Sequence, residues 1–290
     1  MANVTREDFS VAAATNASAY RRVTIPVLRI EAGPGPAVAL IAGVHGDEWE
    51  GQAAILDLCS RAPARPEKRD SGIAAALEAR LLSRVQAMVD VHSGGASLRY
   101  LPSSVITRHG NDAYDDRLPA LARAFGLPDC VFFRGGEAGS MPAAASRHSV
   151  LRLSAEIGGG RETSQSLVDR CRDGLLGCLA ELGLLTPRAR PHAAQDAEVR
   201  LYDLDAPAAT LRARESGVFV PAVELGQSVA ARQPIGRLIE PARPDAPPRP
   251  LLSPQAGTVV CLRPIARSDD GDCLLQVASA LPLDSLASKY

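Results

Sequence analysis

Three short apolar runs, each followed or closed by a histidine or a glutamate, constrain the fold of this chain most. They cover residues 37–43, 85–91 and 150–157. A continuous apolar run of this length is typical of a strand that is buried on both faces of a parallel or mixed sheet. Helical patterns separate and follow these runs, at residues 47–59, 71–85, 117–127 and 163–185. Strands that alternate with helices predict an α/β fold, a doubly wound layer around a mixed sheet.

The character of the sequence changes near residue 187. Beyond it come prolines, turns and short β-branched runs, with no helical pattern. The segment "SGVFVPAVELG" at 216–226 resembles "AGTVVCLRPIA" at 256–266, which predicts a small all-β, barrel-sandwich-like domain with two related halves. We therefore expect an α/β domain over 1–190, and a linker followed by the all-β domain over 191–290. No helix longer than two turns is expected within 216–278.

The overall composition excludes several kinds of partner. The formal net charge is −1, so the chain has no general attraction for nucleic acid or for an anionic membrane surface. No apolar run approaches the ~18 residues that a membrane span needs, and the first ten residues show no export-signal pattern. The six cysteines are scattered, which indicates free thiols in a reducing compartment. These features predict a cytoplasmic protein that acts on a small molecule. A homo-oligomer is left open.

Polar residues at the ends of the three apolar runs form the candidate site. His45 and Glu48 follow the first run, and His92 follows the second. The carboxyl ends of parallel strands meet at one edge of a sheet, where ligands bind in open α/β folds. Two histidines and one carboxylate, with a fourth position open, are the ligand set of a catalytic zinc ion. The sequence therefore predicts that these three side chains converge on one metal.

Two further residues have predicted roles beside this metal site. Glu156 ends the third apolar run and is the candidate general base that takes a proton from water on the zinc. Asp90 precedes His92 by two residues, so strand alternation places both on the same side of the sheet. Asp90 can then orient the His92 ring without itself binding the metal.

A second interpretation needs no metal. His45 and His92 would then be loop histidines on solvated turns, and Glu48 would only stabilise a helix N-terminus through charge–dipole attraction. The pattern of residues alone favours neither interpretation.

A resemblance to a known family bears on this choice. The segments "AGVHGDEWEG", "VDVHSGG" and "SAEIGGG", in this order, are similar to those of the succinylglutamate desuccinylase/aspartoacylase family, relatives of the zinc carboxypeptidases. The C-terminal segment "ESGVFVPAVELGQSVAARQPIGRLIE" also resembles the β-domain of this family. The resemblance implies a zinc site at His45, Glu48 and His92, with Glu156 as base. It is strongest to the bacterial branch that includes N-acetyl-diaminobutyrate deacetylases.

The chain departs from the family pattern between Glu48 and His92. The family has a longer segment there, with an arginine that polarises the scissile carbonyl and an Asn-Leu-Asn-Arg-like motif that holds the substrate carboxylate. Here the interval spans only 44 positions and contains no asparagine. Either the segment is lost or it is a mobile loop missing from the printed chain, in which case the trace would break between Leu58 and Gly72. Arg161 and Arg134 are the candidate replacements for carboxylate binding.

The sequence thus predicts a zinc-dependent amidohydrolase that deacylates a small N-acyl amino acid or amine by attack of a metal-bound water. The alternatives are a metallocarboxypeptidase, which cleaves peptides, and a metal-binding protein without catalysis.

Overall fold

The structure is a computed structural model that covers residues 1–290. The parts it describes are residues 3–12, 22–31, 33–60, 65–66, 81–108, 112–134, 140–185, 199–206 and 208–282. The expected chain break between Leu58 and Gly72 and most of the predicted helix at 71–85 lie outside these residues. No helix in the described part of the chain is long and apolar enough to cross a membrane.

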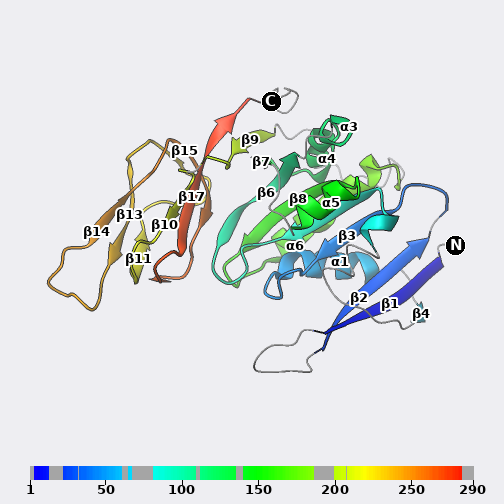
Figure 1. Ribbon diagram of the computed structural model, residues 1–290, viewed down its shortest axis with the longest axis horizontal. Coiled ribbons are helices and arrows are strands. Elements are labelled where there is room, and N and C mark those ends of the chain that lie inside the picture. The colour runs from blue at the N-terminus through cyan, green and yellow to red at the C-terminus, as the bar shows by residue number, and fades with distance from the viewer. Residues whose placement is uncertain are drawn as a thin grey trace.

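A ten-stranded mixed sheet runs through the molecule (Figure 1). Its strands follow one another in the order β12-β15-β17-β9-β7-β6-β8-β5-β3, and β10 pairs with β17. The strands from the predicted α/β region are β3 (Val38–Ala42), β5 (Ala87–His92), β6 (Arg99–Arg108), β7 (Asp129–Arg134) and β8 (Leu151–Gly159). Each of the three predicted apolar runs therefore overlaps a strand of this sheet.

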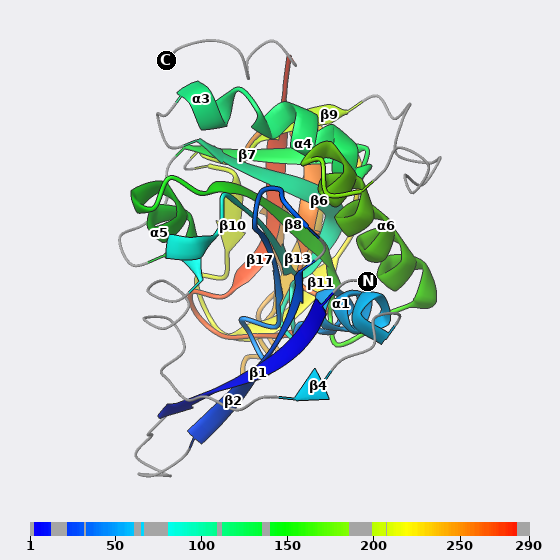
Figure 2. The ribbon, with the colours of Figure 1, turned by 90° about the vertical axis from the view of Figure 1, so that its right-hand side faces the viewer.

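Helices cover both faces of these strands, as the alternating pattern predicts. Figure 2 shows α1 (Trp49–Ser60), α4 (Leu118–Phe125) and α6 (Gln165–Glu181) on one side, with α5 (Met141–Arg147) on the other. Val91, Leu153 and Leu175 belong to the core on the first side, and Met88 and Ala145 to the core on the second. The described residues also include two short elements, the 3₁₀ turn η1 (Leu82–Arg84) and α3 (Asp112–Asp115).

The strands that carry the candidate site run in the same direction. β5 pairs in parallel with β3 on one side and with β8 on the other. β6 is antiparallel to β8, which makes the sheet mixed. Because β3, β5 and β8 are parallel neighbours, the residues that follow or close them meet at one edge of the sheet.

Two local features differ from the expectation from sequence. The run at 37–43 is predicted to be buried on both faces, and this is wrong. β3 ends the sheet with β5 as its strand partner, and within β3 only Ala39 is buried. The structure also has an N-terminal antiparallel pair of β1 (Asn3–Ala12) and β2 (Arg22–Glu31), which lies outside the three apolar runs. The short β4 (Arg65–Pro66) pairs with β1.

The region after residue 199 is all-β in its described part. Its strands are β9 (Arg200–Asp203), β10 (Thr210–Arg212), β11 (Gly217–Pro221), β12 (Ser228–Val229), β13 (Pro234–Ile239), β14 (Arg249–Leu252), β15 (Gly257–Leu262), β16 (Arg267–Ser268) and β17 (Cys273–Leu281). All of residues 216–278 are described and contain no helix, as predicted. The two similar segments supply β11, in a four-stranded sheet, and β15, in the main sheet.

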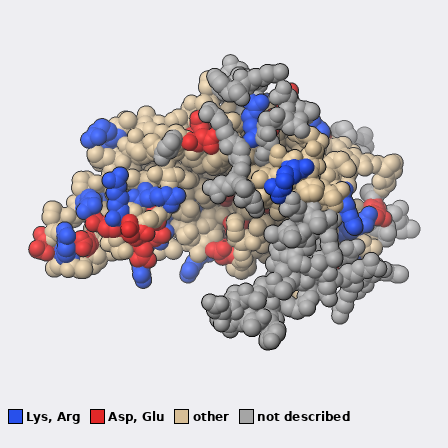
Figure 3. Space-filling model, in the orientation of Figure 1, with Lys and Arg blue, Asp and Glu red and all other residues tan. Residues whose placement is uncertain are grey.

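The surface of this C-terminal region carries both signs of charge side by side (Figure 3). Arg249 lies 3.0 Å from Glu215, and Arg243 lies 3.2 Å from Glu240. Such mixing leaves little field at a distance.

All six cysteines are in described segments, and none forms a disulfide. Cys171 and Cys178 pack in the core, as their helical spacing indicates.

Candidate metal centre

The loop between β3 and α1 presents the first two residues of the site. The backbone N–H of Glu48 donates to the carbonyl of His45 at 3.3 Å, which closes a tight turn just before the helix. This turn brings His45 Nδ1 to 2.6 Å from Glu48 Oε1. Glu48 is buried, whereas 63% of the His45 side chain is exposed. The site therefore opens to solvent on the His45 side.

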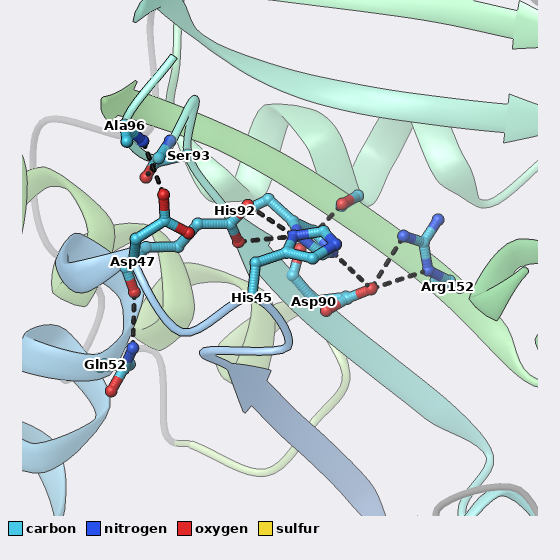
Figure 4. Close-up of polar contacts among 11 residues, drawn as sticks. His45, Asp47, Gln52, Asp90, His92, Ser93, Ala96 and Arg152 are labelled. Carbon is cyan, nitrogen blue, oxygen red and sulfur yellow. Dashed lines mark hydrogen bonds and ion pairs between the residues drawn. The ribbon is translucent and has the colours of Figure 1, made fainter. Parts of the chain in front are cut away.

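His92, at the end of β5, completes the cluster. Its Nδ1 lies 3.0 Å from Glu48 Oε2, so each histidine contacts a different oxygen of the Glu48 carboxylate. The ligand atoms of His45, Glu48 and His92 all lie within 4.8 Å of one another. The centroids of the two rings lie 5.3 Å apart, and Figure 4 shows both rings in the same part of the site. The structure thus brings together the three residues that the sequence predicted to converge.

A buried carboxylate contacts the other ring nitrogen of His92. His92 Nε2 lies 3.1 Å from Asp90 Oδ2, and Asp90 is fully buried. Burial alone would raise the pKa of Asp90, but its contacts with His92 and Arg152 hold that pKa below its usual value. Burial would likewise lower the pKa of His92, yet the carboxylates of Asp90 and Glu48 raise it to about 10. A metal-free His92 is therefore charged at neutral pH.

Arg152 is a member of this site that the sequence analysis missed. Its Nη2 and Nε lie 2.9 and 3.3 Å from Asp90 Oδ2. A signal for it exists in the sequence, because Arg152, Ser154 and Glu156 alternate along an otherwise apolar strand. Alternation places all three on one face of β8. Ser154 also faces β5 and donates its hydroxyl to the carbonyl of Asp90 at 2.9 Å.

Glu156 lies next to His92 on the neighbouring strand. The two residues are direct partners in the parallel register of β5 and β8. Glu156 Oε2 is buried and has no hydrogen-bond partner among the described residues. Burial raises the pKa of Glu156 to about 8, although the positive charge of His92 acts in the opposite direction. A carboxyl whose pKa lies near neutrality can take up and release a proton during a reaction.

The C-terminal region closes one side of Glu156. A cavity of about 60 Å³ lies against this residue, and its walls include Tyr100 and Phe133 from the main strands. Leu204, Val260 and Gln276 of the C-terminal region line the same cavity.

Two more carboxylates in the "HGDEWEG" segment tie the helix to the loops of the site. Asp47 Oδ2 accepts a hydrogen bond from the Ala96 N–H at 2.7 Å, in the loop after His92. Glu50, which is buried, accepts one from the Gly159 N–H at 3.2 Å, just beyond Glu156. Glu48 lies between them in sequence and faces the histidines. The crowding of acidic residues at the start of α1 therefore has a structural purpose, since it fixes three segments relative to one another.

The candidate carboxylate-binding arginines are less well defined. The backbone N–H of Arg161 donates to the carbonyl of Gly95 at 3.0 Å, so this residue stands beside the loop after His92, and its side chain is exposed. Arg134 ends β7, and its side chain is outside the described part of the structure. Arg99, which the sequence analysis did not single out, lies 2.5 Å from Glu162.

The donor set fits a metal ion. Two imidazole nitrogens and a carboxylate face one another from three places in the chain. With Asp90 at Nε2 of His92, the Nδ1 atom is left to face Glu48 and the shared point. Histidine nitrogens together with a carboxylate suit zinc and related transition metals better than magnesium or calcium.

The fold and the site define an α/β protein with a His-Glu-His cluster at the carboxyl ends of parallel strands, and comparison with known proteins agrees. The sequence model of the succinylglutamate desuccinylase/aspartoacylase catalytic domain matches residues 60–182. This match begins after His45 and Glu48 and includes Asp90, His92 and Glu156. Over these residues the chain is similar to the succinylglutamate desuccinylase/aspartoacylase family.

Individual relatives span nearly the whole chain. An N-alpha-acetyl-L-2,4-diaminobutyric acid deacetylase of Halomonas elongata is 25% identical, over 91% of this chain and 88% of the relative. A succinylglutamate desuccinylase structure from Silicibacter has a TM-score of 0.82 at 21% identity, covering 96% of this chain and 95% of the other. The product-bound ectoine utilization protein EutE (DoeB) of Ruegeria pomeroyi gives 0.81 at 23% identity, with 95% of each chain covered. These structures share the fold of this protein.

The alignment with the Halomonas protein is longer than this chain. It extends over 308 positions, more than the 290 residues of this chain. The relative therefore has residues with no counterpart here.

Proposed function

We propose that this protein is a zinc-dependent hydrolase of linear amide bonds that removes the acyl group from a small N-acyl amino acid or amine. The observation that carries the proposal is the convergence of His45, Glu48 and His92 within 4.8 Å, with Glu156 in register beside His92. On this proposal the main domain has the zinc-carboxypeptidase type of fold, and the C-terminal β region is a barrel-sandwich-like domain.

Each residue of the cluster has a distinct task in this reaction. When bound, the zinc ion would polarise the acyl carbonyl and activate water. Glu156, with a pKa near 8, would accept the proton of the attacking water and return it to the departing amine. Asp90 would keep the His92 ring in position.

The relatives support the acyl-transfer class. The names of the Halomonas and Silicibacter proteins describe removal of an acetyl and of a succinyl group. The Halomonas name favours an N-acetylated diamino acid as the first substrate to try for this chain. We expect such a small molecule, and neither nucleic acid nor membrane, to be the partner of a cytoplasmic enzyme.

Recognition of a substrate carboxylate needs residues outside the metal cluster. On this proposal Arg161, which borders the loop after His92, and Arg134, at the end of β7, take the place of the family arginines. If neither does, the chain is a metal-binding protein without this catalysis. A metallocarboxypeptidase that cleaves peptides is the other alternative.

One substrate panel separates these three functions. The zinc-loaded protein is assayed with N-acetyl and N-succinyl amino acids, with N-alpha-acetyl-L-2,4-diaminobutyrate and with peptides that carry a free C-terminus. We expect turnover of an N-acyl amino acid that is lost on treatment with a chelator and restored by zinc. Turnover of peptides alone would point to the carboxypeptidase. Tight zinc binding with no turnover would point to the non-catalytic protein.

A further inference from the structure

The buried Arg152 and its contact with Asp90 suggest a function that no resemblance assigns. Arg152 is 6% exposed, and Asp90 is fully buried. A buried guanidinium is costly unless it is paired with an anion. Here Nη2 and Nε of Arg152 approach the same oxygen, Asp90 Oδ2, at 2.9 and 3.3 Å.

The same oxygen also holds His92. His92 Nε2 lies 3.1 Å from Asp90 Oδ2, while Asp90 Oδ1 has no hydrogen-bond partner among the described residues. The contacts with Arg152 and with His92 therefore meet at one atom. If the Asp90 carboxylate rotated and lost its contact with Arg152, its contact with His92 would change as well. Figure 4 shows this line of contacts, from Arg152 through Asp90 to His92.

The strand register places Arg152 behind the site rather than in it. Arg152 is opposite Met88, Ser154 is opposite Asp90, and Glu156 is opposite His92. Arg152 thus reaches forward by two register positions to contact Asp90 and lies away from the open His45 side. We propose that Arg152 is a positioning residue. It fixes Asp90 Oδ2 and thereby directs Nδ1 of His92 to the metal shared with His45 and Glu48.

This inference rests on the proposed metal site, but its test does not require turnover. Zinc affinity is measured by competition with a chelator for the wild type, Arg152→Met and Arg152→Lys, together with the melting temperature of each metal-free protein. Loss of a group that orients a metal ligand typically weakens metal binding by about 10–100-fold. We expect a weakening in this range for Arg152→Met and a smaller one for Arg152→Lys, which keeps the charge but offers a single donor group.

A matched control separates positioning from simple charge balance. Arg200 pairs with Asp129, a second buried aspartate, through two contacts of 2.9 Å on strands that do not carry the metal residues. We expect Arg200→Met to lower the melting temperature and leave zinc affinity unchanged. An Arg152→Met protein that behaves in the same way would overturn the inference. So would tighter zinc binding, because removal of a positive charge alone favours a divalent cation.

A double variant tests whether Arg152 acts through Asp90. The Asp90→Asn protein lacks the charge that Arg152 neutralises, and the Asp90→Asn/Arg152→Met protein lacks both charges. We expect Arg152→Met to weaken zinc binding in the wild type and to have no further effect in the Asp90→Asn background. Additive effects would overturn the inference. Normal zinc affinity in Arg152→Met would refute the role of Arg152 alone, whereas a wild type that binds zinc without deacylating any substrate would refute only the proposed function.

Discussion

At the scale of single residues, Glu156 carries the most specific chemical proposal. Its carboxyl has a pKa of about 8 through burial, and it neighbours His92 without being part of the metal cluster. We expect Glu156→Gln to retain zinc and to lose activity by about 10²–10⁴-fold, because the amide keeps the shape and cannot accept a proton. Zinc content and kcat are measured on the same preparation. Activity near that of the wild type would remove Glu156 from the role of base.

His92 gives a second residue-scale prediction, for the dependence of zinc binding on pH. Its pKa is about 10 in the metal-free protein, since Asp90 and Glu48 outweigh the effect of burial. A metal binds only the neutral ring, so binding must release this proton. Zinc affinity should therefore rise by up to about tenfold per pH unit below pH 10 for this one proton. Proton release is measured by calorimetry in buffers of different ionisation enthalpy, and zinc binding without release at pH 7 would contradict the prediction.

The direction of the pKa shift of His92 determines how protonation of this residue affects the stability of the metal-free fold. The pKa of His92 is raised from 6.5 in the folded protein. Its proton therefore stabilises the metal-free fold fully below pH 6.5, and this contribution disappears as the pH rises through about 10.

At the scale of elements, α4 and α6 pack closely at two glycines of α6. A Cβ atom added at Gly177 would lie 1.9 Å from the carbonyl oxygen of Ala124, and one at Gly174 would lie 2.6 Å from the Phe125 ring. A backbone atom cannot move aside as a flexible side chain can, so Gly177→Ala must push the helices apart.

We expect Gly177→Ala to destabilise the protein by about 1–3 kcal/mol or more, the usual effect of overpacking. Arg170→Ala, at an exposed position of the same helix, is the control and should change stability by less than about 0.5 kcal/mol. Urea unfolding followed by circular dichroism gives both values. Equal stability of the two variants would mean that α4 and α6 do not touch as described.

The elements also show how far a sequence can predict this fold. The apolar runs and helical patterns locate β3, β5, β8, α1, α4 and α6, because burial imposes a period on the residues. The strand β1 has no such signal. Its sequence "NVTREDFSVA" is largely polar, and the strand exists through its long-range pairing with β2. The edge position of β3 is likewise a property of the sheet order, which no local pattern contains.

In the candidate site, too, local sequence patterns reveal some residues and long-range contacts determine the others. His45, Glu48, His92 and Asp90 could be found from sequence, because strand ends and alternation place them. Arg152 was missed because its meaning depends on Asp90, 62 positions away, on a neighbouring strand. The contacts of Asp47 and Glu50 could not be predicted, because their partners are backbone groups of distant loops, and residue type does not reveal such contacts.

At the scale of the whole molecule, the C-terminal β region contributes strands to the sheet that carries the site. β9 pairs with β7, and β15 pairs with β6, so strands from both sides of the predicted boundary near residue 190 share hydrogen bonds. The same region lines the cavity beside Glu156 with Leu204, Val260 and Gln276. The division into domains 1–190 and 191–290 stays a prediction, and these shared strands make independent folding of the two parts costly.

We therefore expect the metal-free protein to unfold in one cooperative transition. Separation of the parts would expose the edges of β6 and β7 and leave their backbone groups unpaired. Calorimetry tests this, since a single two-state transition has equal calorimetric and van't Hoff enthalpies. The variant Phe219→Ala tests whether the C-terminal region unfolds together with the rest, because Phe219 lies in the core of that region and is 1% exposed. Loss of this ring should cost about 3–5 kcal/mol and shift the whole transition. Two resolved transitions, of which Phe219→Ala moves only one, would show that the C-terminal region is an independent folding unit.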